Sequence, residues 1–178
     1  MPRVPGKVER AARQLLDAAG VTKPPVPVEK LVAAEGIRLA FDSIGGQDVS
    51  GMLYRRGAVT VMVVNQDHHR HRQRFTIAHE LGHHRLHDAD AYLDGTATLR
   101  FRDGTSAAGT DREEREANSF GAALLMPADW VRDNFMSLVT ARRGVDEDTA
   151  VARLAHQFDV SEQAMRFRLV NLGLIDPT

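Results

Sequence analysis

The residues of this chain best suited to chemistry are two histidines and a glutamate in the pattern H-E-x-x-H, namely His79, Glu80 and His83. Because the histidines are four positions apart, a helix would place both imidazoles on one face, with Cβ atoms roughly 5–6 Å apart. That spacing suits two nitrogen ligands of one zinc ion. Glu80 lies next to His79, so its carboxylate could take a proton from a metal-activated water without binding the metal. The pattern predicts the metal centre of a peptidase.

The residues around this motif favour a helix over a chance match. Apolar residues recur near helical spacing through the segment, at Phe75, Ala78, Leu81, Gly82 and Leu86. A glycine inside a helix costs about 1 kcal/mol relative to alanine. We therefore expect another element to approach the motif helix closely at Gly82.

The sequence after the motif excludes one peptidase subclass. A metzincin would carry glycine and a third histidine at the third and sixth positions after His83, where this chain has Leu86 and Ala89. His87 is also four positions from His83, but the residues between them include no general base. We expect His84 and His87 to lie on the polar face or to support the ligands.

A catalytic zinc usually has three protein ligands, so a third must come from elsewhere. The run Thr110-Asp-Arg-Glu113 is a capping box and predicts a helix through Leu125, before Pro127. The buried stripe of this helix is expected to comprise Ala117, Phe120, Gly121, Leu124 and Leu125.

Among the glutamates of that helix, Glu114 lies at the edge of the stripe, whereas Glu116 falls off it and Glu113 is occupied by the cap. We therefore predict Glu114 as the third metal ligand. Asn118, one turn further, could hydrogen-bond a ligand histidine. A solvated, charge-rich helix face is the alternative for each glutamate.

Two segments resemble the ImmA/IrrE family of zinc metallo-endopeptidases. They are Arg72–His83 (RQRFTIAHELGH) and Glu114–Pro127 (EREANSFGAALLMP), and the resemblance extends to Pro25–Lys30, Val49–Leu53 and Leu154–Leu174. It implies a zincin-like fold and cleavage of a helix-turn-helix repressor, which relieves repression after stress or in mobile-element and toxin–antitoxin circuits. Gly121 departs from the pattern, since the family usually has alanine there; this bears on packing and not on the site.

Composition limits the class of protein further. A chain of 178 residues can form one domain, or one with a small appendage, and bury roughly 68–70% of its unfolded surface. It has no cysteine, which excludes disulfides and thiolate ligands and fits a reducing compartment. Without a signal-like start or a long apolar run, it is expected to be soluble and cytoplasmic, with no membrane partner. The net charge of −1 argues against general nucleic-acid affinity.

The order of predicted elements indicates an α+β fold with a zincin-like core. Two helices come first, Lys7–Ala19 and one ending at Gly36; strands Ile37–Phe41, Ser50–Tyr54 and Ala58–Val64 follow, the last two joined by a turn at residues 55–57. The uniformly apolar third strand predicts a central position. Ser50–Tyr54 is short, contains Gly51 and is followed by Arg55-Arg56, so we expect it at the sheet edge, where a peptide substrate could pair. Asp88–Gly109 is predicted to be a loop near the site.

Residues 128–178 predict a C-terminal helical region that follows a peptidase core of residues 1–127. The expected helices are Asp129–Arg142, Glu147–Phe158 and one capped by Ser161 that ends at Leu172. The last two, joined at Asp159-Val160, could form a DNA-reading unit with Arg166 and Arg168. A packed helical appendage is favoured, because the turn lacks glycine and the chain is not basic.

Three classes of function follow from these features. The first is a zinc endopeptidase that acts on a separate helix-turn-helix repressor, with His87 and Tyr92 as candidate hydrogen-bond donors to the oxyanion. The second is a DNA-binding regulator with a zinc site, and the third is a protein-binding module with little or no proteolysis. Glu80 favours the first, because a structural zinc needs no base.

Overall fold

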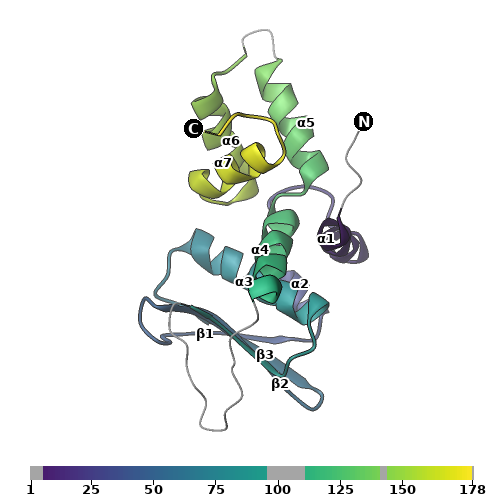
Figure 1. Ribbon diagram of the computed structural model, residues 1–178, viewed down its shortest axis with the longest axis vertical. Helices are drawn as coiled ribbons and strands as arrows, with labels where there is room; N and C mark the ends of the chain where they lie inside the picture. The colour runs from purple at the N-terminus through teal and green to yellow at the C-terminus, as the bar shows by residue number, and fades with distance from the viewer. Residues whose placement is uncertain (1–5, 96–110, 141–143, 178) are drawn as a thin grey trace.

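The computed structural model describes residues 6–95, 111–140 and 144–177. The N-terminal half contains α1 (Lys7–Ala18), α2 (Val28–Ala34), β1 (Arg38–Asp42), β2 (Val49–Arg56), β3 (Val59–Asn65), α3 (Arg70–Leu86) and β4 (Ala91–Gly95). The remainder is helical: α4 (Asp111–Leu125), α5 (Ala128–Val139), α6 (Glu147–Phe158) and α7 (Glu162–Asn171). The predicted α+β class is confirmed (Figure 1). The expected cap at Thr110 lies outside the described residues.

The four strands form one mixed sheet in the order β1-β3-β2-β4. β3 is central as predicted, because it pairs in parallel with β1 and antiparallel with β2. The turn between β2 and β3 falls at Gly57-Ala58, where Gly57 has a φ of 59° that glycine readily adopts. The other predicted turn residues, Arg55 and Arg56, belong to β2.

The prediction that Ser50–Tyr54 is an edge strand is wrong. These residues belong to β2, which has β3 on one side and β4 on the other, with Leu53 opposite Tyr92. β4 arises within the segment Asp88–Gly109 that was predicted to be a loop; residues 96–109 of that segment are not described. Its sequence AYLDG includes aspartate and glycine, which are depleted in strands, so only pairing with β2 makes it a strand.

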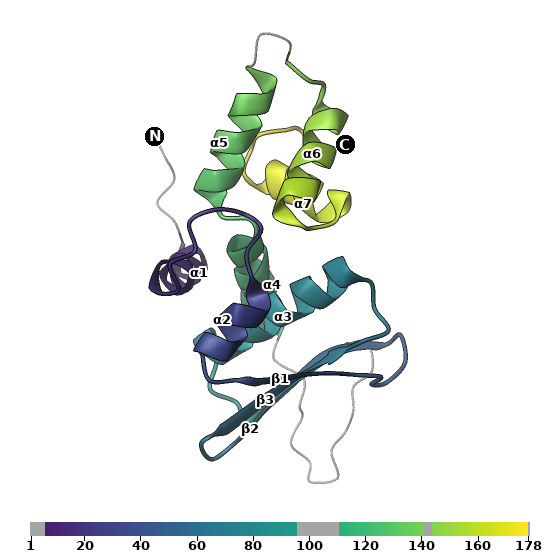
Figure 2. The same ribbon diagram turned by 180° about the vertical axis from the view of Figure 1, so that it is seen from behind.

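The helices cover one face of the sheet in successive layers. α2 and α3 lie directly over it, α4 packs on α3, and α5–α7 gather at the end furthest from the sheet (Figures 1 and 2). Alternate residues of β2 and β3, such as Leu53 and Met62, are fully buried and share one core with Ile77 and Leu81 of α3. The sheet is therefore the platform on which the motif helix rests. No helix in the described ranges has the length and apolar character needed to cross a membrane.

The helices α3 and α4 meet backbone to backbone. A Cβ atom placed on Gly82 would lie 3.0 Å from Cα of Ala117 and 3.1 Å from Cβ of Phe120. On the partner helix, a Cβ atom on Gly121 would lie 3.2 Å from the backbone nitrogen of His79. The close approach predicted at Gly82 is confirmed, and Gly121 makes the reciprocal contact from α4.

The turn between α6 and α7 is anchored to the start of α3. Asp159 adopts a left-handed conformation (φ 54°, ψ 53°), at the turn where a DNA-reading unit often has glycine. Its carboxylate lies 2.7 Å from Nη2 of Arg70, 3.2 Å from Nε of Arg74 and 3.4 Å from Nε2 of His71. This cluster joins the C-terminal helices to the motif helix.

The two arginines considered for DNA reading form ion pairs with other residues of the chain. Arg168 is buried, donates from Nε to the carbonyl of Met126 at 2.9 Å and pairs with Glu9 at 2.8 Å. Arg166 pairs with Glu147 at 2.9 Å and also with Asp148. These contacts favour the packed appendage over the DNA-reading unit. The division into units of residues 1–127 and 128–178 stays a prediction.

We expect Asp159→Asn to destabilise the fold by about 1–3 kcal/mol at pH 7, while asparagine still tolerates the left-handed backbone. The hydrogen bond from Arg70 holds the pKa of Asp159 below its usual value of 3.8, despite partial burial, and the charge of Arg74 acts in the same direction. A lowered folded-state pKa means that the stabilisation is present above the unfolded pKa and is lost as the pH falls through the folded one. Urea unfolding at pH 7 and at pH 3 should show a smaller difference at pH 3.

The matched control for that experiment is Asp148→Asn, which changes an exposed ion pair and should alter stability by no more than about 0.5 kcal/mol. Equal stability of the Asp159→Asn and wild-type proteins at pH 7 would contradict the anchoring role of the cluster.

A second prediction concerns the helix contact at Gly82. Alanine is intrinsically better than glycine in a helix by about 1 kcal/mol, yet its methyl group would press on the backbone of Ala117, and such overpacking costs about 1–3 kcal/mol. We expect Gly82→Ala to lower the melting temperature in a thermal unfolding scan. A rise would show that the two helices can separate without penalty.

Candidate metal centre

The three predicted ligand side chains converge on one point from two helices. His79 and His83 lie one turn apart on α3, with their Nε2 atoms 3.0 Å apart. Glu114, in the first turn of α4, places Oε2 at 3.4 Å from Nε2 of His79 and Oε1 at 3.3 Å from Nε2 of His83. Both imidazoles are buried, whereas the Glu114 side chain is 33% exposed. The three groups could hold a metal ion.

The size of this triangle suits a small tetrahedral ion. Ligand atoms about 2.0–2.1 Å from a metal stand about 3.3 Å from one another at tetrahedral angles. The three separations of 3.0–3.4 Å lie close to that value. Three side chains would leave one tetrahedral position for water or substrate, as catalytic sites do.

The outer nitrogen of His79 is held by Asn118, as the sequence predicts. Nδ1 of His79 lies 3.1 Å from Oδ1 of Asn118. Because an amide oxygen only accepts hydrogen bonds, Nδ1 must carry the proton. The lone pair on Nε2 is then directed at the triangle, which is the tautomer that a metal requires.

Charge states at the site also fit metal binding. Burial raises the pKa of Glu114, but hydrogen bonds from His79 and His83 outweigh it and lower the pKa to about 2. A metal ion held at the triangle would take the place of the Nε2 protons in these hydrogen bonds. Burial also lowers the pKa of His83, with a smaller contribution from the charge of His79, against the opposing effect of Glu114. A charged carboxylate beside a neutral imidazole is the combination that can bind a cation at neutral pH.

Glu80 lies beside this triangle without being part of the ligand group. Its side chain is completely buried between α3 and β2. A Cβ atom on Gly51 of β2 would lie 3.3 Å from Oε1 of Glu80 and 2.4 Å from Cγ2 of Thr76. The sequence analysis took Gly51 as an edge-strand signal, whereas the structure shows that it makes room for α3 and the Glu80 carboxylate.

His87 and Tyr92, the candidate donors to an oxyanion, both support His83. The Tyr92 ring stacks on the His83 ring with centroids 3.9 Å apart and an interplanar angle of 20°, and its hydroxyl accepts a hydrogen bond from the backbone N–H of Ala89 at 3.3 Å. His87 Nδ1 lies 3.1 Å from Nδ1 of His83, across that ring from Nε2. These positions favour a supporting role over contact with a reacting carbonyl.

Arg55, at the end of β2, is a residue that the sequence analysis missed. Its guanidinium donates to the carbonyls of His84 at 2.9 Å, Ala89 at 2.8 Å and His87 at 3.1 Å. Carbonyls at a helix C-terminus lack intrahelical partners, and a cation is favoured there. Arg55 thereby fixes the end of α3 that carries His83. No local pattern could reveal this, because Arg55 and His84 are 29 positions apart.

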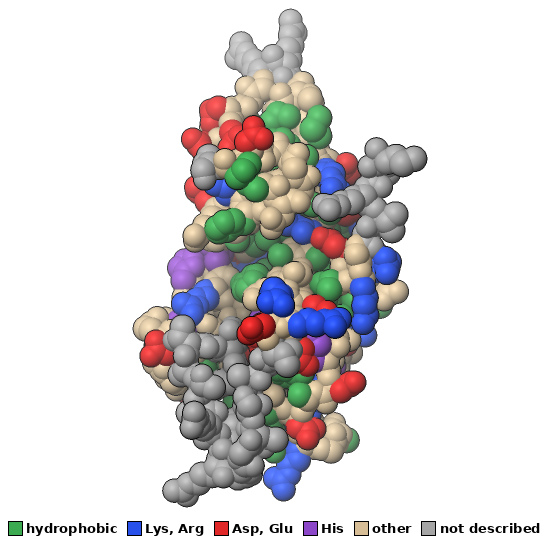
Figure 3. All heavy atoms as spheres, in the orientation of Figure 1, with side chains coloured by type: hydrophobic (Ala, Val, Ile, Leu, Met, Phe, Trp, Pro, Cys, Tyr) green, Lys and Arg blue, Asp and Glu red, His purple; other side chains and the backbone are tan. Residues whose placement is uncertain are grey.

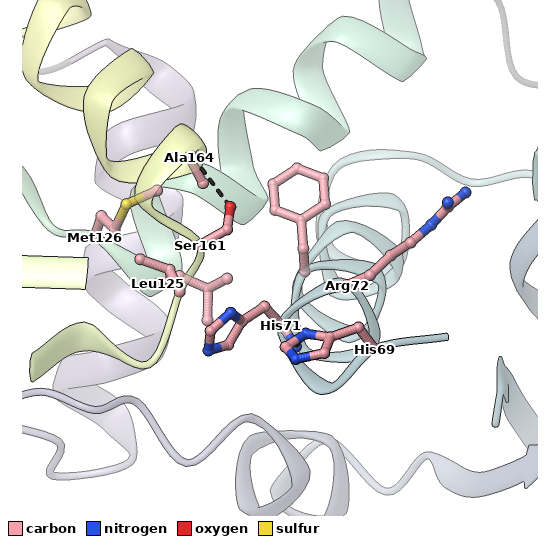
Figure 4. Close-up of a pocket in the computed structure, with 9 residues that line it drawn as sticks. His69, His71, Arg72, Leu125, Met126, Ser161 and Ala164 are labelled. Atoms are coloured by element: carbon pink, nitrogen blue, oxygen red, sulfur yellow. Dashed lines mark hydrogen bonds between the residues drawn. The ribbon is translucent and has the colours of Figure 1, made fainter. Parts of the chain in front are cut away.

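A cavity of about 300 Å³ opens beside the first turns of α3. Its lining combines an apolar floor with basic side chains: His69, His71, Arg72, Phe75, Leu125, Met126, Val160, Ser161 and Ala164 (Figure 4). Ser161 caps α7 as predicted, since its hydroxyl accepts from the N–H of Ala164 at 3.1 Å. Histidine side chains also gather beside hydrophobic ones on the face shown in Figure 3. Phe75 lines the cavity and lies near the triangle, since the centroid of its ring is 6.4 Å from that of the His79 ring.

A sheet that supports an H-E-x-x-H helix, with an acidic side chain brought in by a second helix, defines the zincin-like class of metallopeptidases. The family model described as the IrrE N-terminal-like domain, Peptidase_M78, matches residues 32–170, and the chain belongs to this family. The resemblance seen in the sequence is therefore confirmed.

A comparison with solved structures shows a similar fold at low sequence identity. A Mycobacterium tuberculosis transcriptional regulator superposes with a TM-score of 0.61 at 16% identity. The alignment covers 92% of this chain but 46% of the regulator, so this chain spans about half the length of that protein. No curated protein matches the sequence significantly.

We expect Glu114→Gln to weaken Zn²⁺ binding by more than the roughly 10–100-fold that loss of a supporting residue costs. A neutral amide cannot supply the negative charge that Glu114 places at the triangle. Competition with a chromogenic zinc chelator measures the affinity. The control is Asp111→Asn, an exposed position in the same helical turn, which should bind like wild type. Equal affinities of the two variants would remove Glu114 from the ligand set.

Proposed function

We propose that this protein is a zinc-dependent endopeptidase in which His79, His83 and Glu114 bind the metal and Glu80 is the general base. The observation that carries the proposal is the triangle of His79, His83 and Glu114, together with the buried carboxylate of Glu80 next to His79 on the same helix. Membership of a peptidase family supports the same reading. Two imidazoles and one carboxylate favour zinc over magnesium or calcium, which prefer oxygen ligands.

The side chains around the site divide the work of peptide hydrolysis. A zinc ion bound there would supply Lewis acidity, which makes a water acidic and polarises a peptide carbonyl. Glu80 accepts the proton of the attacking water and delivers it to the leaving amine, so that the carboxylate is restored at the end of the cycle. Gly51 leaves room for this role, because a Cβ atom at that position would clash with Thr76 at 2.4 Å and press on Oε1 of Glu80 at 3.3 Å.

The position of β4 supports a path for the peptide substrate. Among the described strands β4 pairs with β2 alone, so its other edge can accept main-chain hydrogen bonds from an extended peptide. Tyr92 of β4 stacks on His83, which brings this edge next to the proposed ligands. β4 therefore takes the place first assigned to Ser50–Tyr54. The cavity floored by Phe75, Leu125 and Met126 offers room for an apolar side chain of the substrate.

The substrate class that we propose is a separate helix-turn-helix repressor, cut in an exposed loop or linker. The family resemblance supports this class. A peptide bond must lie in an extended segment to reach a metal on a helix face, and such segments are found in loops. Relief of repression would follow from cleavage.

A transcriptional regulator remains the second candidate, because the M. tuberculosis protein with a similar fold is a transcriptional regulator. The internal contacts of Arg166 and Arg168 weigh against DNA reading by α7. The presence of Glu80 also favours hydrolysis, since a zinc that only stabilises the fold requires no base beside it.

The decisive experiment combines Glu80→Gln with a cleavage assay. Loss of a general base should reduce the rate of hydrolysis by about 10²–10⁴-fold, while the metal ligands are untouched. The substrates to test are helix-turn-helix repressors from the same genome, and cleavage is followed by gel electrophoresis and mass spectrometry. Zinc content is measured on the same samples.

The matched control is Glu29→Gln, an exposed glutamate on α2 that should leave both zinc content and rate unchanged. Full activity in Glu80→Gln would refute the mechanism. Tight sequence-specific DNA binding by a chain that cleaves nothing would favour the regulator.

A further inference from the structure

A chain of hydrogen bonds leads from His83 through the buried His87 to the partly exposed Glu116 of α4. Nδ1 of His83 lies 3.1 Å from Nδ1 of His87, and Nε2 of His87 lies 3.2 Å from Oε2 of Glu116. The other carboxylate oxygen of Glu116 accepts from Nε of Arg112 at 2.9 Å. The two imidazoles are buried, whereas Arg112 is largely exposed. α4 therefore contacts both ring nitrogens of His83. Glu114 lies at Nε2, and Glu116 acts on Nδ1 through His87.

The direction of this chain follows from the chemistry of its last acceptor. A carboxylate only accepts hydrogen bonds, so His87 must carry its proton on Nε2. A neutral His87 then has a lone pair on Nδ1, which accepts from His83. His83 in turn must be protonated at Nδ1, and when it is neutral its Nε2 keeps a lone pair directed at the point on which Glu114 and His79 also converge. Glu116 therefore selects, two residues away, the tautomer that a metal at the triangle requires.

The backbone at the end of α3 holds His87 in place for this task. His87 is the first residue beyond the helix and has extended dihedral angles of φ −132° and ψ 153°. Its N–H donates to the carbonyl of His83 at 3.1 Å, and its own carbonyl accepts from Arg55. The backbone of His87 is therefore held on both sides of its Cα atom, which restricts where the ring can lie. An ordinary surface histidine would have no such constraints.

We propose that His87 and Glu116 are positioning residues that lock His83 into its metal-binding tautomer and orientation. This inference rests on the proposed metal-binding role of His83. The link to Glu116 also makes His83 a more basic metal ligand, because a hydrogen bond from its Nδ1–H increases the electron density on Nε2. Glu116, which helix phase sets aside as a ligand, acts on the site through His87.

The test measures Zn²⁺ affinity by chelator competition in four variants. His87→Leu removes both hydrogen bonds and Glu116→Ala removes the terminal acceptor; each should weaken zinc binding about 10–100-fold. His87→Gln is the conservative variant, because its amide can accept from His83 and donate to Glu116, and it should recover most of the affinity. Arg112→Gln is the control, since it breaks the exposed ion pair and keeps the buried chain, and it should change the affinity less than threefold.

Two further readouts separate positioning from general stability. The unfolding midpoint of the metal-free protein should be similar in wild type and Glu116→Ala. The visible absorption of the Co²⁺-loaded protein, which reports ligand geometry, should shift in His87→Leu and return toward wild type in His87→Gln.

Unchanged zinc affinity in both His87→Leu and Glu116→Ala would overturn the inference. So would losses that follow the stability of the metal-free protein and that His87→Gln does not reverse. A wild-type protein that binds no zinc would refute the proposed function itself, whereas a wild type that binds zinc and cleaves, alongside unaffected variants, would refute only this inference.

Discussion

The site depends on how closely α3 and α4 approach each other. Its proposed ligands come from both helices, and metal coordination tolerates errors of only about 0.2 Å in ligand distance. Gly82 and Gly121 allow the two backbones to touch, so the crossing has little freedom to open. The close contact between α3 and α4 brings the Glu114 carboxylate within 3.4 Å of both imidazoles. A larger residue at either glycine would move the carboxylate by more than the metal tolerates.

The sheet fixes the same helix from the opposite side. Gly51 lets β2 lie directly beneath α3, Arg55 binds the carbonyls at the helix end, and Tyr92 of β4 covers the ring of His83. α3 is therefore confined between a backbone contact above and a strand pair below. This explains why a site with few ligands can be placed accurately in a small domain: both ligand histidines are buried against elements that are themselves fixed by hydrogen bonds.

What the sequence could predict was set by the range of the interactions involved. The spacing of His79 and His83 and the helical phase of Glu114 are local, and the structure brings these three side chains together. The placement of Ser50–Tyr54 at an edge was wrong because β4 pairs with its outer side. β4 could not be recognised in the sequence, since it contains aspartate and glycine, which are depleted in strands. Arg55 and the partner of His87 were missed for a related reason: each acts on a residue 29 positions away, and no local periodicity links them.

Glu114 and Glu116 illustrate the limit of reasoning from helix phase. Two residues apart on a helix means a rotation of roughly 200°, so both side chains cannot face the same point. The rule correctly separates the glutamate that contacts both Nε2 atoms from the one that does not. It does not show that the second is idle, because His87 stands beyond the end of α3 and can meet a carboxylate on another face of α4. Helix phase determines which glutamate can contact the triangle directly. The hydrogen bonds through His87 determine that Glu116 can still influence His83.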